Sequence, residues 1–128
     1  MKDGISGIGV VASIAPAVQT ATKKGDAVDL RDFNQATLII NTGAIAGSGD
    51  FTASIQESDT TTDGDFAAVA AGDLLGSVPD VLDATSAYKL GYVGNKRYVR
   101  AVLTLNSGTS IAAGAVFVLG QPYDAPVA

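Results

Sequence analysis

The chain has 128 residues, enough for one domain with its own core, and a formal net charge of −5. It contains no cysteine and no histidine, which excludes disulfides, thiol nucleophiles, histidine-based acid–base catalysis and the usual zinc sites. Charged residues make up only 16% of the chain, against ~25% in a typical globular domain, which predicts that part of the surface is covered by copies of the chain or by a larger assembly.

The N-terminal part is expected to begin with a flexible arm, residues 1–7. The apolar run 8–14 then predicts a first strand, which Pro16 should end. The first 19 residues look superficially like a signal peptide, but glycines break the apolar run and an aspartate follows the one lysine. No segment is long enough to span a bilayer, so we expect no membrane partner.

Three further strands are predicted before the middle of the chain. Residues 27–30 suit a short strand, and the almost continuously apolar segment 36–42, ATLIINT, is typical of a central strand covered on both sides. In residues 51–56 large apolar side chains alternate with polar ones, which indicates a strand with one buried face. The glycine-rich segment 43–50 matches no phosphate-binding motif and predicts a hairpin turn.

The most acidic segment is 57–65, ESDTTTDGD, which should be an exposed loop. Glu57 and Asp59 could project from one face like a glycosidase pair, but the chain has no tryptophan for a sugar platform, so a solvated loop is predicted instead. The segment also departs from a calcium-binding EF-hand loop, with Thr61 at the third position and Ala70 at the twelfth, although an incidental calcium site stays the alternative. We expect no metal, no cofactor, no small-molecule substrate and no enzymatic activity.

The remaining segments complete an all-β pattern. Residues 66–75, FAAVAAGDLL, predict an edge strand or a helical turn, since Gly72 weakens an otherwise good helix former. Residues 110–120 predict a last strand, and the two prolines in 121–128 favour an extended arm over a central strand. The chain is therefore predicted to be one compact β-sandwich or jelly-roll-like domain over 1–128, with about six to eight strands and at most one short helix.

Residues 87–105, AYKLGYVGNKRYVRAVLTL, are expected to form a β-hairpin around a Gly-Asn turn at 94–95. A turn of two residues would set Lys89 directly across from Arg100, where the two like charges repel. A turn of four residues would keep the same faces but shift the partners. A turn of three would mix the faces, so an even turn is predicted.

The outer face of this hairpin carries unpaired cations beside an aromatic ring, which predicts a surface that docks on an acidic protein partner; an ordinary strand with hydrated charges is the alternative. The same basic group could stack on nucleic acid, but the net charge of −5 favours a protein surface. The predicted interface residues, including one in the C-terminal arm, are Lys89, Arg97, Tyr98, Arg100 and Tyr123.

Two segments, 56–77 (QESDTTTDGDFAAVAAGDLLGS) and 88–104 (YKLGYVGNKRYVRAVLT), precede a Gly-Gln-Pro-Tyr-Asp-Ala-Pro-Val tail. Together they resemble a family of small virion proteins of tailed phages and prophages, typically encoded near the major capsid protein. The resemblance extends over most of the chain, and the shared signatures are structural rather than catalytic.

The resemblance implies a bacteriophage capsid decoration, or cement, protein. Such a protein would lie on the outer surface of the virion, be assembled in the host cytoplasm, and have the major capsid protein and copies of itself, as a homotrimer, for partners. A neck or tail protein with a head–tail joining role is the alternative. A carbohydrate-binding module would need an exposed aromatic platform, for which the chain offers only its tyrosines.

Overall fold

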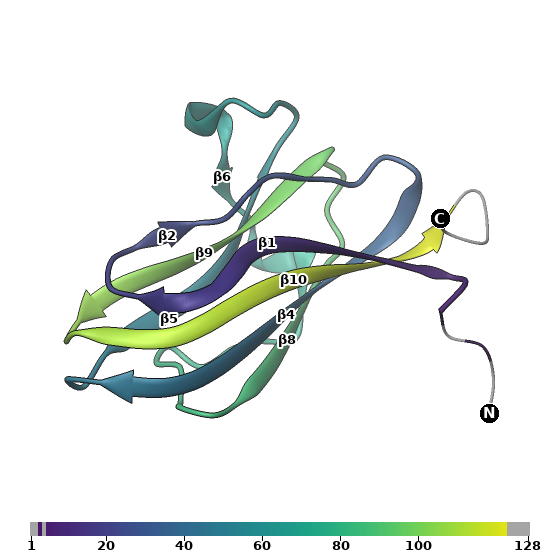
Figure 1. Ribbon diagram of the computed structural model, residues 1–128. Coiled ribbons are helices and arrows are strands. Elements are labelled where there is room, and N and C mark those ends of the chain that lie inside the picture. The colour runs from purple at the N-terminus through teal and green to yellow at the C-terminus, as the bar shows by residue number, and fades with distance from the viewer. Residues whose placement is uncertain (1–2, 4, 123–128) are drawn as a thin grey trace.

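The structure is a computed structural model that describes residues 3 and 5–122, and it confirms an all-β sandwich (Figure 1). Two antiparallel sheets pack face to face. Sheet A has the strand order β1-β10-β4-β8-β7, and sheet B has the order β2-β9-β5-β6, with β3 also paired to β9. The strands are β1 (Ile8–Gln19), β2 (Lys23–Lys24), β3 (Val28–Asp29), β4 (Phe33–Ala46), β5 (Asp50–Ser58), β6 (Ala67–Ala68), β7 (Leu74–Leu75), β8 (Ala87–Tyr92), β9 (Tyr98–Ser107) and β10 (Ser110–Pro122), and two 3-10 turns are η1 (Asp63–Asp65) and η2 (Ala71–Asp73).

The strands pair in a nested order, which confirms the jelly-roll-like prediction and supplies its topology. The first strand, β1, pairs with the last, β10; β2 and β3 pair with β9; β4 pairs with β8; and β5 pairs with β6. A chain paired in this way is a long hairpin rolled into two sheets, which is the jelly-roll arrangement. β1 therefore begins, and β10 ends, at the same end of the sandwich (Figure 1).

The core lies between the sheets and is built by period-two alternation. Leu38 and Ile40 of β4 and Phe117 of β10 point inward from sheet A, and Phe51 and Ile55 of β5 meet them from sheet B. Each such side chain, removed fully from water, contributes about 1.5–3 kcal/mol. The prediction that residues 36–42 are covered on both sides is wrong, because the side chains between the buried ones are partly or fully exposed.

The predicted hairpin over 87–105 is wrong. β8 pairs with β4 and β7 in sheet A, while β9 pairs with β5, β2 and β3 in sheet B. The segment 93–97 therefore connects the two sheets instead of turning within one. The inward side chains of β8 and β9 face each other across the core, and this arrangement produces the same alternation as two adjacent hairpin strands.

The glycine-rich segment 43–50 is not a hairpin turn either. β4 continues to Ala46, and residues 47–49 carry the chain from sheet A to β5 of sheet B. The same end of the sandwich holds the β9–β10 connection, in which Gly108 has a φ of +80°. A Cβ there would collide with the backbone of Ser48, so the close approach of these two connections requires glycine.

Two prolines lie inside strands. β1 passes through Pro16 instead of ending there, with register shifts between Ala12 and Ala17. An edge strand tolerates proline because only one side of it forms a ladder. Pro122 pairs with Phe33, so the first two residues of the predicted C-terminal arm belong to β10. The other arm residues at 1, 2, 4 and 123–128 lie outside the described residues.

The segment 66–75 confirms both parts of its prediction. It forms β6 at the edge of sheet B, the helical turn η2, and β7 at the edge of sheet A. Neither 3-10 turn in the described part of the chain has the length needed for a membrane span.

Candidate interaction surfaces

The structure does not gather the predicted interface residues on one surface. Lys89 is exposed on β8 in sheet A, whereas Tyr98 and Arg100 lie on β9 in sheet B. Arg97 lies in the connection between these strands. Tyr123 lies outside the described residues. The expected opposition of Lys89 and Arg100 across one ladder is therefore absent.

Arg100 is buried and fully occupied by its own chain, which corrects the prediction of an unpaired cation. Its Nε and Nη2 donate to Gln56 Oε1 at 2.9 and 2.7 Å, and its Nη1 donates to Asp63 Oδ1 at 2.6 Å. The guanidinium also lies 4.2 Å from the centroid of the Phe66 ring. We call Arg100, Gln56, Asp63 and Phe66 the Arg100 cluster.

Two features bring the Arg100 cluster together: the register of the β9–β5 ladder and the 3-10 turn η1. Arg100 lies opposite Gln56 in the β9–β5 ladder, and η1 brings Asp63 of the acidic segment back over the outer face of sheet B. The hydrogen bond from Arg100, together with the charge of Lys24, lowers the pKa of the Asp63 carboxyl. The acidic partner expected from another protein is, for Arg100, this chain's own loop.

The neighbouring basic side chains also pair within the chain. Lys96 Nζ lies 3.0 Å from Asp59 Oδ2. Arg97 donates from Nε and Nη2 to both carboxylate oxygens of Asp29, at 3.1 and 3.0 Å, and its guanidinium lies 5.0 Å from the Tyr98 ring centroid. These pairs are partly exposed, so each contributes little stability, but they leave few free charges around β9.

Glu57 and Asp59, the carboxylates considered for sugar cleavage, have separate structural partners. The buried Tyr92 hydroxyl donates to Glu57 Oε1 at 2.7 Å and accepts from the Lys96 backbone N–H at 3.1 Å. Burial, followed by the hydrogen bond to Glu57, raises the pKa of Tyr92. Within the described residues, no three acidic side chains come together in a group that could hold a metal ion.

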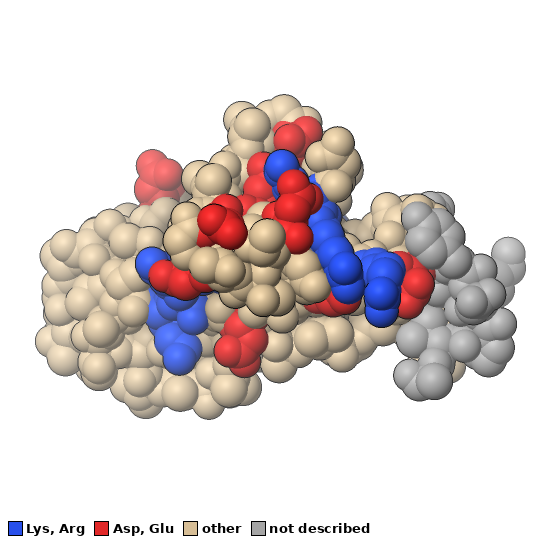
Figure 2. Space-filling model, turned by 90° about the horizontal axis from the view of Figure 1, so that it is seen from above, with Lys and Arg blue, Asp and Glu red and all other residues tan. Residues whose placement is uncertain are grey.

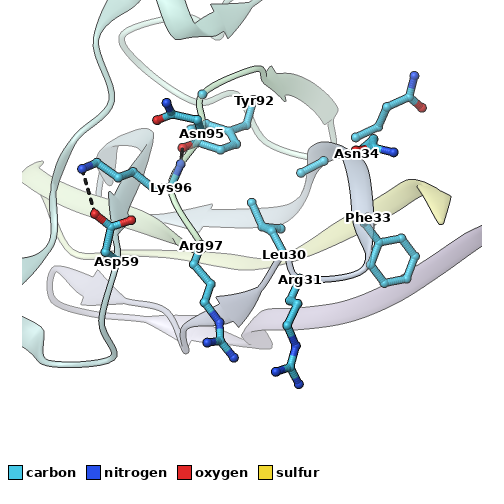
Figure 3. Close-up of a pocket in the computed structure, with 12 residues that line it drawn as sticks. Leu30, Arg31, Phe33, Asn34, Asp59, Tyr92, Asn95, Lys96 and Arg97 are labelled. Carbon is cyan, nitrogen blue, oxygen red and sulfur yellow. Dashed lines mark hydrogen bonds and ion pairs between the residues drawn. The ribbon is translucent and has the colours of Figure 1, made fainter. Parts of the chain in front are cut away.

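One open pocket of about 460 Å³ lies where β4 begins and β8 ends (Figure 3). Lys96 contacts Asp59 at one side of the pocket, while the Arg31 and Arg97 side chains extend together in another direction (Figure 3). Two of its cations are paired with carboxylates, Lys96 with Asp59 and Arg97 with Asp29. The residues that line it are Leu30, Arg31, Phe33, Asn34, Gln35, Ala36, Asp59, Tyr92, Gly94, Asn95, Lys96 and Arg97.

Charge is distributed unequally between the two sheets. Figure 2 shows acidic and basic side chains interleaved over one part of the molecule, with largely uncharged surface beside them. The five strands of sheet A contain a single charged residue, Lys89, although sheet A includes the three longest strands of the fold. The outer face of sheet A is therefore nearly uncharged.

This outer face of sheet A is also apolar and shallowly hollowed. Val10 and Val18 of β1 are exposed, and Val116 and Val118 of β10 and Ile39 of β4 are partly exposed. A groove of about 470 Å³ follows the bulged part of β1, where Pro16 lies against Gly114. Its lining is Ile14, Pro16, Ile39, Asn41, Thr42, Gly43, Ala113, Gly114, Ala115 and Val116.

The sequence itself contains a signal for this face, in three segments that lack charged residues. Residues 4–22 contain no charged side chain, and neither do residues 33–46 nor 110–122. Once β1, β4 and β10 are neighbours, these three uncharged segments become one surface.

No protein-family model matches the chain, and a search of curated proteins finds no significant match.

Proposed function

We propose that the chain is a non-enzymatic structural protein of a tailed-phage virion that decorates the capsid shell, with the outer face of sheet A as its contact surface. The observation that carries the proposal is the charge distribution of sheet A, in which Lys89 is the one charged residue of five strands. A monomeric protein with that much exposed uncharged sheet lacks the usual solvated exterior.

A nearly uncharged, gently concave face suits adhesion to another protein. Apolar surface removed from water contributes roughly 25 cal/mol per Å² before association costs are subtracted. On a shell the same contact repeats many times, so a modest gain per copy stabilises the whole assembly. Binding by this face depends on apolar burial and requires no charged partner.

The virion setting comes from the resemblance of segments 56–77 and 88–104 to phage virion proteins. The jelly-roll topology is compatible with it, since that topology recurs in viral capsid domains, although a fold alone does not decide a function. The non-enzymatic part of the proposal is supported by the use of the polar side chains, because Arg100, Lys96 and Arg97 are each paired with a carboxylate of the same chain.

Copy number in purified particles tests the role. A decoration protein should be present in hundreds of copies, in a fixed ratio to the major capsid protein. A single ring of about six or twelve copies would overturn decoration in favour of the neck or tail role. Absence from purified particles would overturn the virion proposal altogether.

Particle binding by variants tests the surface. Val116→Lys places a charge on the outer face of sheet A, opposite uncharged neighbours on β4 and β1, and Val81→Lys places the same charge at an exposed site in the loop before β8. Both variants should fold, but only Val116→Lys should lose binding to particles that lack the protein. Binding should also change little between low and high salt. Equal binding by the two variants would show that the contact lies elsewhere.

A further inference from the structure

β1 is the longest open sheet edge among the described residues. At the other three edge positions the strands β7, β2 and β6 have two residues each, whereas β1 has twelve. Every second residue of an edge strand presents its backbone N–H and C=O away from the sheet, ready to pair with another strand. An edge of this length needs either protection or a partner.

The protection of β1 is confined to its middle and its second half. The Ser13 carbonyl accepts a hydrogen bond from the Asp26 N–H at 2.7 Å, and Pro16 and the register shifts around it disrupt the strand further along. The first part, Ile8–Ala12, is regular in its pairing with β10 and contains no lysine, no proline and no other charge. Natural proteins use lysine, other charged residues and proline to keep edge strands from pairing, and this part of β1 has none of them.

Val11 indicates that a covering strand is missing at this edge. It lies directly opposite Phe117 of β10, and residues opposite each other in an antiparallel pair share one face of the sheet. Phe117 is 0% exposed in the core, yet Val11 is 41% exposed. The inner face of β1 therefore has a large apolar side chain that the isolated domain leaves half in water.

We propose that Ile8–Ala12 pairs antiparallel with the same segment of a second copy, which joins sheet A of the two copies into one continuous sheet. Two antiparallel copies of this five-residue segment pair over their full length only when the central residue, Val10, lies opposite Val10 of the second copy. Ile8 then opposes Ala12 of the second copy, and Gly9 opposes Val11. The contact forms an apolar ladder on the outer face and covers Val11 on the inner face.

The occupant is a second copy because the edge is self-complementary and has no other recognition element. Residues 4–22 carry no charge that could select a different partner or that would repel an identical one. Val10 is 62% exposed, and two valines facing each other across a ladder pack favourably. Pairing of identical edges uses the same surface on both copies, so it produces a dimer and leaves no free edge for a third copy. This dimer differs from the homotrimer that the family resemblance implies.

This inference concerns the free protein and does not rest on the proposed function. Sedimentation of the full chain at micromolar to tens-of-micromolar concentration should show a dimer. Val10→Lys should raise the dissociation constant by about tenfold or more, because two lysines then oppose each other at the dyad. The matched control is Val93→Lys, at a site with similar exposure (52%) beyond β8, and it should sediment like the parent.

A charge-pair experiment distinguishes like-with-like pairing from any other contact. Val10→Lys and Val10→Glu should each be mainly monomeric alone, with unchanged far-UV circular dichroism, and should form a dimer when mixed. A mixture of Val93→Lys and Val93→Glu should show no such recovery relative to its components. A monomeric parent, a trimer, an oligomer insensitive to Val10→Lys, or a Val10 mixture that stays monomeric would overturn the proposal.

Discussion

Replacing Arg100 by alanine should destabilise the domain, which reverses what an exposed arginine would predict. The substitution removes two hydrogen bonds to one oxygen of Gln56, the ion pair with Asp63 and the contact with the Phe66 ring. A hydrogen bond with a charged donor contributes about 1.5–3 kcal/mol, and the ring contact about 1 kcal/mol. The ion pair adds little to this, because Asp63 is largely exposed.

These contributions are not independent, so we expect a loss of about 2–4 kcal/mol in the free energy of unfolding. Urea denaturation followed by far-UV circular dichroism measures it directly, with tyrosine fluorescence as a second probe in a chain without tryptophan. Lys89→Ala is the control on the other sheet and should change stability by less than ~0.5 kcal/mol. If Arg100→Ala is as stable as the parent, or more stable, the Arg100 cluster does not hold the acidic loop as described.

Three other predictions test the electrostatics, the core and the absence of a metal requirement. Because Arg100 lowers the pKa of Asp63, this carboxylate stabilises the fold at all pH values above its ordinary pKa of 3.8 and loses that effect as the pH falls through the lowered pKa. The stability difference between the parent and Asp63→Asn should therefore be constant above about pH 5 and disappear in acid; a difference that persists in acid would contradict the assignment. Leu90→Ala, at a buried site opposite Leu38, should cost about 2–5 kcal/mol in chemical denaturation, and a loss below 1 kcal/mol would mean that β8 is not part of the core. Addition of a chelator should leave the melting temperature unchanged, and a lower value would reveal a structural metal.

Period-two alternation was sufficient to predict the fold class and most strands, because each long strand has one face toward the core. The segments 51–56 and 110–120 show this clearly, with buried Phe51 and Phe117 at the expected positions. Alternation reports which side chains are buried, but not whether two consecutive strands lie side by side or face to face. For that reason residues 87–105 looked like a hairpin although β8 and β9 belong to different sheets.

The interface residues were harder to predict, because their surroundings depend on contacts distant in sequence. Arg100 occupies an outward position of β9 that alternation predicts to be exposed. It is buried because the loop that contains Asp63, 37 residues away in the sequence, folds over it. The residues next to Arg100 in the sequence do not predict that contact. The uncharged face of sheet A was accessible in principle from the three charge-free segments, but only the strand order makes them adjacent.

The nested strand pairing also determines when this protein can fold. β10 lies between β1 and β4, so two of the earliest strands to leave the ribosome have no bridge between them until one of the last segments of the described chain has been synthesised. Contacts between such distant segments make folding slow and leave unpaired strands exposed meanwhile. Sheet A therefore cannot be completed before β10 has emerged from the ribosome. A nascent chain halted before residue 110 would expose the apolar edges of both β1 and β4 to chaperones and to other nascent copies.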